Sequence, residues 1–183
     1  MSYTPHTIDT APAAARETLA GVNKSYGFVP NLMGVMAEAP ALLRAYRTIV
    51  DLFDETSLNP TERQIVLLTT SYENRCEYCV AAHSVIAGMQ QVPEAVVQAI
   101  RSGQPIDNPR LEALRRFTAA IVVSRGWPSD EEKAAFANAG YDKAQALEVV
   151  LGVSVKTLSN YTNHIADTPL DRAFAKAAWS KAA

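Results

Sequence analysis

The chain has 183 residues, and its composition is that of one soluble globular domain. Hydrophobic residues make up 48% and charged residues 20%, a balance that supports a sizeable core without disulfide or metal staples. The net charge is −2 and no block of Lys and Arg residues is present, so the sequence predicts no basic surface that would bind a nucleic acid or an anionic membrane. We therefore expect a single domain over residues 1–183 and neither of these partners.

Targeting and membrane-spanning signals are missing from the sequence. The first ten residues lack a basic segment followed by an apolar one, and the run from Leu147 to Val155 is interrupted and too short to cross a bilayer. The only two cysteines lie close together, so a bridge between them would close a tiny loop and stabilise little. We expect a cytoplasmic protein whose cysteines serve chemistry.

The N-terminal half predicts an arm followed by helices. Pro5 and Pro12 mark residues 1–12 as an arm that crosses the surface or a neighbouring subunit. Strong helix formers predict a first helix over residues 13–20, which ends at Gly21. The expected elements that follow are a buried loop (26–31), a short helix (31–37), a helix from Pro40 and a helix from Pro60 with Asn59 as its cap.

The C-terminal half continues the helical pattern to the end of the chain. Further helices are expected through the cysteines to Met89, from Pro93 to Gly103, from Leu111 to Gly126, from Ser129 to Asn138 and from Lys143 to Ile165. The last of these is expected to bury Leu147, Val150, Leu151, Val155 and Leu158, with Tyr161 as a further candidate. No strand pattern is present, so the predicted fold class is all-α.

The motif Cys76-x-x-Cys79-x-x-x-His83 is the chemical feature of the chain. Side chains three and four residues apart share one face of a helix, so the two thiols and the imidazole are expected to lie together. A thiol with an ordinary pKa is only about 3% ionised at pH 7, and the thiolate is the nucleophile. A site that lowers the pKa of one thiol is therefore expected.

Two physical arguments point to different attacking sulfurs. With Asn74 as the cap and Arg75 as the first residue, Cys76 falls in the first turn of the helix, where free amides and the Arg75 charge favour a thiolate. Cys79 has His83 four residues later, which can take its proton and pass it to a leaving oxygen. We favour Cys79 as the attacking thiol, because peroxide reduction also needs that proton, and Cys76 as the resolving thiol.

Two other interpretations of the motif stay open. The cysteines can be inert buried residues, although a C-x-x-C pair with an aligned histidine is an unusual pattern for that role. Alternatively, Cys76, Cys79 and His83 can supply three zinc ligands with His164 as a fourth, although a second C-x-x-C is missing. The expected site contains no metal and no cofactor.

Several segments of the sequence resemble one known family. The motif together with Ser71-Tyr72-Glu73-Asn74 and Glu62-Arg63 is similar to the alkylhydroperoxidase AhpD-like, carboxymuconolactone decarboxylase superfamily. Tyr26-Gly27-Phe28-Val29-Pro30-Asn31 and the segment 158–164 resemble its peroxidase-related branch. The resemblance implies an all-helical AhpD-like bundle, a homo-oligomer such as a trimer or hexamer, and thiol-dependent peroxidase or disulfide reductase activity.

The resemblance also implies roles for individual residues. Cys79 matches the peroxidatic cysteine of the family, Cys76 its partner and His83 the histidine of its proton relay. Where the family has a glutamate to orient that histidine, this chain has Gln64, which can hold the imidazole but cannot share its proton. Glu73, closer to the cysteines, is the predicted substitute.

The predicted function is thus a peroxidase of the peroxiredoxin type that reduces a hydroperoxide, with a dithiol, thioredoxin or lipoyl-type reductant. One alternative is a carboxymuconolactone decarboxylase-like lyase in which His83 and Glu73 perform acid–base chemistry on a lactone. Another is a non-catalytic binding or zinc-stabilised module. Met33, Met36, Phe28, Phe53 and Tyr161 are candidates for the wall of an apolar pocket.

Overall fold

The computed structural model describes residues 2–181, which form helices and connecting loops without a strand. The elements are α1 (Ala13–Tyr26), α2 (Asn31–Met36), α3 (Pro40–Asp54), α4 (Pro60–Glu73), α5 (Glu77–Met89), α6 (Glu94–Arg101), α7 (Pro109–Val123), α8 (Asp130–Asn138), α9 (Lys143–Ala166) and the 3-10 helix η1 (Arg172–Ala177). The all-α prediction is confirmed.

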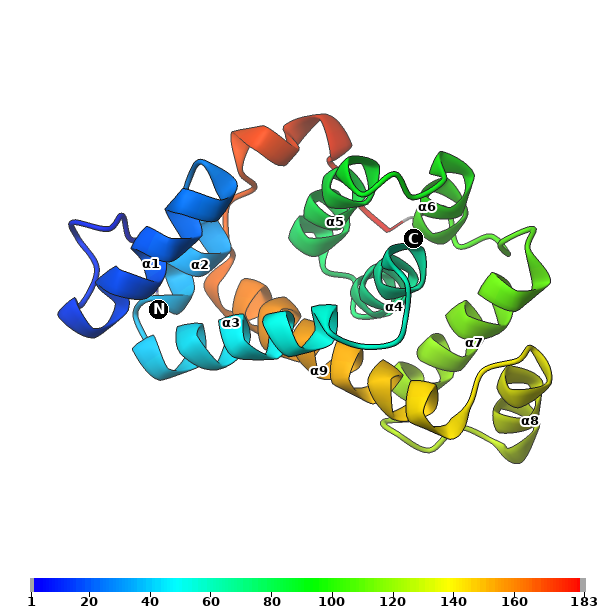
Figure 1. Cartoon of the computed structure of the whole chain (residues 1–183). Helices are drawn as coiled ribbons and strands as arrows, with labels where there is room; N and C mark the ends of the chain where they lie inside the picture. The colour runs from blue at the N-terminus through cyan, green and yellow to red at the C-terminus, as the bar shows by residue number, and fades with distance from the viewer. Residues whose placement is uncertain (1, 182–183) are drawn as a thin grey trace.

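Helix α4 lies at the centre of the molecule (Figure 1), where it packs against α5, α6, α7 and α9. The long helix α9 runs below it and also contacts α2 and α3. Helices α1 and α2 lie at one end of the molecule, and α7 and α8 lie at the other. The crossing of α9 with α3 and α4 is close, because a Cβ at Gly152 would lie 2.7 Å from side-chain atoms of both Phe53 and Val66.

The start of α4 shows why the sequence places a helix there. Asn59 accepts a hydrogen bond from the Glu62 amide, and the Glu62 side chain accepts one from the Asn59 amide, which completes a capping box before Pro60. The Glu62 carboxylate also pairs with Arg110 of α7 and accepts a hydrogen bond from Tyr141. This buried network ties α4 to the α7–α9 end of the molecule.

Two predicted helix boundaries were wrong. Helix α1 continues past Gly21 to Tyr26 and ends at Gly27, whose φ of 78° provides the left-handed C-cap conformation. The loop that follows was expected to be buried, but Tyr26 and Gly27 are exposed and only Pro30 is buried. The second error, at the start of α5, bears on the site and is described below.

The predicted burial of α9 was wrong for half of its apolar residues. Leu147 and Tyr161 are exposed by 72% and 54%, and Val150 is also exposed, whereas Val155 is buried as expected. The buried face of this helix is instead formed largely by small and polar residues, namely Val149, Gly152, Val155, Lys156, Ser159, Asn160, Asn163 and Ala166. The face that the sequence marks as polar is therefore the one that meets α4 and α5.

Both chain ends fold back onto the helices. The predicted arm lies against α2 of its own chain, where the His6 amide donates to the Gly34 carbonyl and the His6 ring pairs with Glu38. After α9, the chain passes through η1 and packs on α5, as the red segment of Figure 1 shows. Over residues 2–181, no helix is both long enough and apolar enough to span a membrane.

Candidate active site

The turn between α4 and α5 places the first cysteine. Arg75 adopts a left-handed conformation with φ of 56°, and the amides of Arg75 and Cys76 bond to the carbonyls of Tyr72 and Ser71. This is a Schellman motif with arginine where glycine is usual. Helix α5 therefore starts at Glu77 with Cys76 as its N-cap, two residues later than predicted.

Because α5 starts at Glu77, its first turn contains Cys79 and not Cys76. Cys79 is the third residue of α5, so it lies in the first turn, where free amide groups favour negative charge. Arg75, which was expected to add positive charge beside Cys76, is exposed to solvent. The argument from the helix N-terminus, made for Cys76 from the sequence, therefore applies to Cys79.

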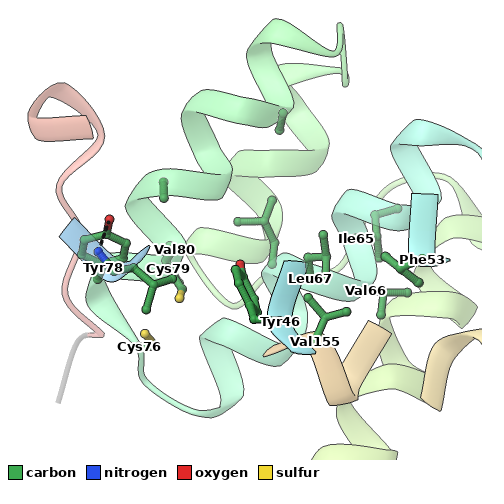
Figure 2. Close-up of a cluster of buried hydrophobic side chains, with 14 of the residues drawn as sticks. Tyr46, Phe53, Ile65, Val66, Leu67, Cys76, Tyr78, Cys79, Val80 and Val155 are labelled. Carbon is green, nitrogen blue, oxygen red and sulfur yellow. Dashed lines mark hydrogen bonds between the residues drawn. The ribbon is translucent and has the colours of Figure 1, made fainter. Parts of the chain in front are cut away.

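The two thiols are buried together but only one faces a cavity. Cys76 and Cys79 are each 1% exposed and carry no disulfide bond, and their sulfur atoms lie beside Tyr78 in Figure 2. Cys79 lines a cavity of about 110 Å³, together with His83, Gln64 and other side chains, whereas Cys76 does not line it. A small molecule in this cavity therefore meets the sulfur of Cys79 first.

Helix α9 surrounds Cys79 with polar groups. The Asn163 side-chain amide donates to Sγ of Cys79 at 3.2 Å and to Sγ of Cys76 at 3.6 Å. The Ser159 hydroxyl lies 3.8 Å from Sγ of Cys79, and Lys156, on the same face of the helix, acts on that sulfur through its positive charge. These positions are three and four residues apart, so one helix face delivers all three groups.

The surroundings separate the pKa values of the two thiols. Burial by itself raises the pKa of Cys79, but the hydrogen bond with Cys76, the charge of Lys156 and the hydrogen bond with Ser159 outweigh it and lower that pKa well below its usual value. The hydrogen bond to Cys79, burial and the nearby negative charge raise the pKa of Cys76. The surroundings therefore favour the thiolate at Cys79 and the protonated thiol at Cys76.

His83 is held in one tautomer by two glutamines. Its Nδ1 lies 3.0 Å from Oε1 of Gln64, which can only accept, so Nδ1 carries the proton. The Gln64 amide group is itself oriented by a bond from its Nε2 to Oε1 of Gln90 at 3.1 Å. Nε2 of His83 is left with a lone pair.

The histidine is neutral in this environment. Burial, followed by the positive charge of Lys156, lowers the pKa of His83 well below its usual 6.5. The imidazole is partly accessible where it lines the cavity and is otherwise enclosed by protein. With Nδ1 bonded to Gln64, its Nε2 is thus a hydrogen-bond acceptor.

The predicted support of His83 by Glu73 is not formed. Glu73 pairs with Lys181, with 3.7 Å between its Oε2 and the lysine Nζ. Glu73 follows Gln64 by nine residues on α4, which places it about 180° around the helix. The acid–base pair on which the lyase alternative depends is therefore absent, and Gln64 itself holds His83.

Several secondary candidates lie elsewhere. Tyr78 is packed, donating its hydroxyl proton to Asp171 and accepting from the Leu32 amide, and Glu77 is exposed. His164 is exposed beside Tyr161, so it does not join the cysteines as a fourth zinc ligand. Within residues 2–181, no three His, Cys, Asp or Glu side chains form a group that could hold a metal ion.

The cavity wall is mostly apolar and comes from six α-helices (α1 to α5 and α9), η1 and the adjoining loops. Met33 and Phe53 line it as predicted, whereas Met36 is buried in the core and Phe28 lies outside the cavity. The apolar and aromatic lining residues are Tyr26, Pro30, Leu32, Met33, Tyr46, Val50, Phe53, Leu67, Tyr78, Ala82, Ile86, Val155 and Phe174. The thiolate, the lysine and the imidazole are polar groups in an apolar enclosure.

Comparison with known proteins agrees with this architecture. The Carboxymuconolactone decarboxylase family matches residues 37–120, which include α3 to α6 and most of α7. A peroxidase-related protein from Ralstonia eutropha JMP134, described as an alkylhydroperoxidase AhpD core, superposes with a TM-score of 0.81 at 21% identity, over 95% of both chains. The chain has the AhpD-like fold, and its residues 37–120 match the Carboxymuconolactone decarboxylase family.

Two further solved structures with this fold are a peroxidase-related protein and a debrominase. A peroxidase-related protein from Silicibacter sp. TM1040 has a TM-score of 0.78 at 15% identity, over 95% of both chains. The debrominase Bmp8, in a cysteine-to-alanine variant bound to 2,3,4-tribromopyrrole, has a TM-score of 0.80 at 20% identity, over 97% of this chain and 95% of that one. No curated protein sequence gives a match.

The AhpD-like fold brings together residues that the sequence did not single out. Lys156, Ser159 and Asn163 surround the sulfurs, and Gln90 orients Gln64. One signal was available, since these three α9 residues share a helical face that interrupts an apolar run. A lysine at such a position is an unusual core residue.

Proposed function

We propose that this chain is a thiol-dependent peroxidase that reduces a hydroperoxide through a dithiol/disulfide cycle of Cys79 and Cys76. The observation that supports it is the asymmetry of the two thiols. Cys79 lines the cavity and its pKa is lowered, whereas Cys76 lies behind it and its pKa is raised. A cycle of this kind needs one thiolate that attacks the peroxide and one neighbouring thiol that then forms the disulfide with it.

The steps follow from these positions. The Cys79 thiolate attacks the terminal oxygen of the hydroperoxide, the O–O bond breaks, and Cys79 becomes a sulfenic acid while an alkoxide leaves and takes up a proton to become an alcohol. Cys76 then attacks that sulfur, a disulfide forms, and the hydroxyl leaves as water with the Cys76 proton. An external dithiol returns two electrons and two protons, and restores the thiolate and the thiol.

His83 and the apolar wall suit a small organic hydroperoxide. Nε2 of His83 can accept the hydrogen bond of the peroxide O–H, which turns the terminal oxygen toward Cys79. The cavity of about 110 Å³ has room for several waters or one small organic group. The role of His83 in this proposal is to position the substrate.

Thiol counting tests the cycle. Reduced protein treated with one equivalent of tert-butyl hydroperoxide is expected to lose two free thiols per chain. Cys79→Ser is expected to consume no peroxide, while Cys76→Ser consumes one equivalent and leaves a sulfenic acid at Cys79 that dimedone traps. Unchanged turnover in Cys79→Ser, or no loss of thiols in the wild type, would refute the proposal.

Reductive dehalogenation is a second candidate, favoured by the similarity to the debrominase Bmp8. A thiolate in an apolar cavity is suited to a small halogenated ring, and a dithiol supplies the two electrons needed to replace a carbon–bromine bond with carbon–hydrogen. The test is bromide release from 2,3,4-tribromopyrrole by the reduced protein. If bromide is released and hydroperoxide is not consumed, this candidate replaces the first.

The resemblance further implies a homo-oligomer, a trimer or a hexamer, and we carry this forward as a proposal. Light scattering of the purified protein, which measures its mass in solution, is expected to give three or six times the mass of one chain. A monomer at micromolar concentration would contradict it.

A further inference from the structure

We propose that Lys156 is the acid of this site: its ammonium group pairs with the Cys79 thiolate and gives its proton to the oxygen that leaves when Cys79 attacks a hydroperoxide. The inference rests on the proposed peroxidase function and adds to it a catalytic residue on α9. It assigns to Lys156 the proton delivery that the sequence suggested for His83.

Lys156 is a buried cation whose anionic partner is the thiolate. It is 1% exposed, and it lines the same cavity as Cys79 and His83. Within residues 2–181 no carboxylate forms an ion pair with it, and Asp54, the carboxylate on the cavity wall, pairs with Arg63. A buried charge without a partner is costly, so the thiolate is what retains the ammonium in this position.

His83 is unsuited to deliver the proton. The proton on Nδ1 is engaged by Gln64, and Nε2 carries no proton. The positive charge of Lys156 also opposes a second proton on the imidazole. Lys156 lines the same cavity as Cys79, lies on the α9 face whose Ser159 and Asn163 contact that sulfur, and as an ammonium has a proton to give.

The remaining ionisable groups around Lys156 do not compete for this role. Those of α5 are the two cysteines and His83, and those of α3 are Tyr46, Arg47 and Asp54; α4 contributes the uncharged Gln64. The pKa of Tyr46 is raised by burial and then by the charge of Cys79, so its hydroxyl is a weaker acid than a free tyrosine. Tyr26 and Tyr78 also line the cavity.

The proton balance closes with this assignment. Cys79–S⁻ and R–O–OH form Cys79–S–OH, and the leaving R–O⁻ takes a proton from Lys156 to become R–OH. The thiolate charge and the ammonium charge disappear in the same step, so no unpaired buried charge remains. When a dithiol reduces the disulfide, its two protons go to Cys76 and to Lys156, and Cys79 is again a thiolate.

Two replacements separate an acid from a simple counter-ion. Lys156→Arg keeps the positive charge but holds its proton permanently, and Lys156→Met keeps the length without the charge. The first assay is the pH dependence of Cys79 alkylation by iodoacetamide, which reports the thiolate without any peroxide. The second compares tert-butyl hydroperoxide, whose leaving alkoxide needs a proton, with peracetic acid, whose leaving acetate does not.

We expect Lys156→Arg to alkylate at a pH close to wild type, yet to react with tert-butyl hydroperoxide about 100-fold more slowly and with peracetic acid at nearly the wild-type rate. Lys156→Met is expected to shift alkylation to higher pH as well. Reaction of Lys156→Arg with tert-butyl hydroperoxide within about threefold of wild type would overturn the inference.

A measurement on the unmodified protein decides the case if either replacement fails to fold. With Lys156 as the acid, the sulfenic acid and the alcohol form without a proton from solvent, so any uptake that recharges Lys156 follows the loss of peroxide. If solvent is the acid instead, uptake of one proton per chain keeps pace with the loss of peroxide, which a pH indicator in a stopped-flow experiment detects. Uptake that coincides with peroxide loss refutes the inference alone, whereas a wild type that consumes no peroxide refutes the proposed function.

Discussion

Gln64 is the residue that sets the charge of His83. The amide accepts the Nδ1 proton and cannot share it, so the imidazole has a fixed tautomer without a negative partner. Lys156 on the other side adds a positive charge. A neutral acceptor is therefore the stable form of this histidine, in contrast to a relay histidine backed by a carboxylate.

Gln64→Glu is expected to reverse this state. A buried carboxylate at position 64 raises the pKa of His83 by attraction and raises that of Cys79 by repulsion. Histidine ring NMR signals and iodoacetamide alkylation measure the two effects. Gln64→Leu is the control, since it removes the hydrogen bond without adding charge, and an unchanged His83 pKa in Gln64→Glu would contradict the prediction.

The lowered pKa of His83 also predicts how stability depends on pH. Below pH 6.5 the unfolded chain binds a proton at His83 that the folded chain does not, so the folded state loses stability as pH falls. The expected slope is about 1.4 kcal/mol per pH unit from this residue. Urea unfolding between pH 7 and pH 5 measures it, and His83→Gln is expected to show a shallower slope.

At the scale of elements, the α4–α5 turn forces Arg75 into a conformation that costs energy. Its φ of 56° disfavours side chains with a Cβ, and its side chain is exposed. The strain persists because the amides of Arg75 and Cys76 close the end of α4, and Cys76 must then start α5. The turn fixes which cysteine lies in the first turn of α5.

Arg75→Gly is therefore expected to stabilise the protein by about 0.5–1 kcal/mol, the relief of strain less the added entropy of the unfolded chain. Arg75→Ala retains the Cβ and is expected to change the free energy of unfolding little. Chemical denaturation measures both. Equal stability of the two variants would show that the backbone strain is unimportant.

Helix α9 buries polar side chains near the thiols and exposes several apolar ones. Its polar side chains are buried against α5, and Asn160 also accepts a hydrogen bond from Asn74 in the α4–α5 turn. Leu147 and Ile165 are exposed by 72% and 70%. Hydrogen bonds and charge, not apolar burial, determine which face of this helix meets the site.

At the scale of the whole molecule, the C-terminal segment closes the region around the cavity. The carboxylate of Asp171 accepts from the Asn31 amide at 3.1 Å and from the hydroxyl of Tyr78, between the two cysteines. Phe174 of η1 lines the cavity, and Trp179 donates to the Arg101 carbonyl at 2.8 Å. Segments from both ends of the chain therefore complete the site.

Asp171→Ala is expected to destabilise the fold by about 2 kcal/mol, because it leaves the Asn31 amide and the Tyr78 hydroxyl without an acceptor. Tyr78→Phe is expected to cost about 1 kcal/mol, and the double variant less than the sum of the two. Thermal or urea unfolding measures all three. Strict additivity would mean that the hydroxyl and the carboxylate do not interact.

The sequence by itself determined the helical architecture and identified the candidate motif. Caps such as Asn59 and Ser129 act within a few residues, and both complete a capping box at the start of a helix that the sequence predicts. The spacing of Cys76, Cys79 and His83 is likewise a local property of one helix. These features depend on neighbours along the chain, which is why they were predictable.

The tertiary structure determined the direction in which the pKa values of the motif's side chains shift. Lys156 lies 77 residues after Cys79 along the chain, and its effect on that thiol exists only because α9 packs against α5. The packing of α4 against α5 likewise places Gln64 beside His83, whereas Glu73 pairs with Lys181. Electrostatic interactions act through space and strengthen with burial, so the pKa values of the site follow from the fold rather than from the motif.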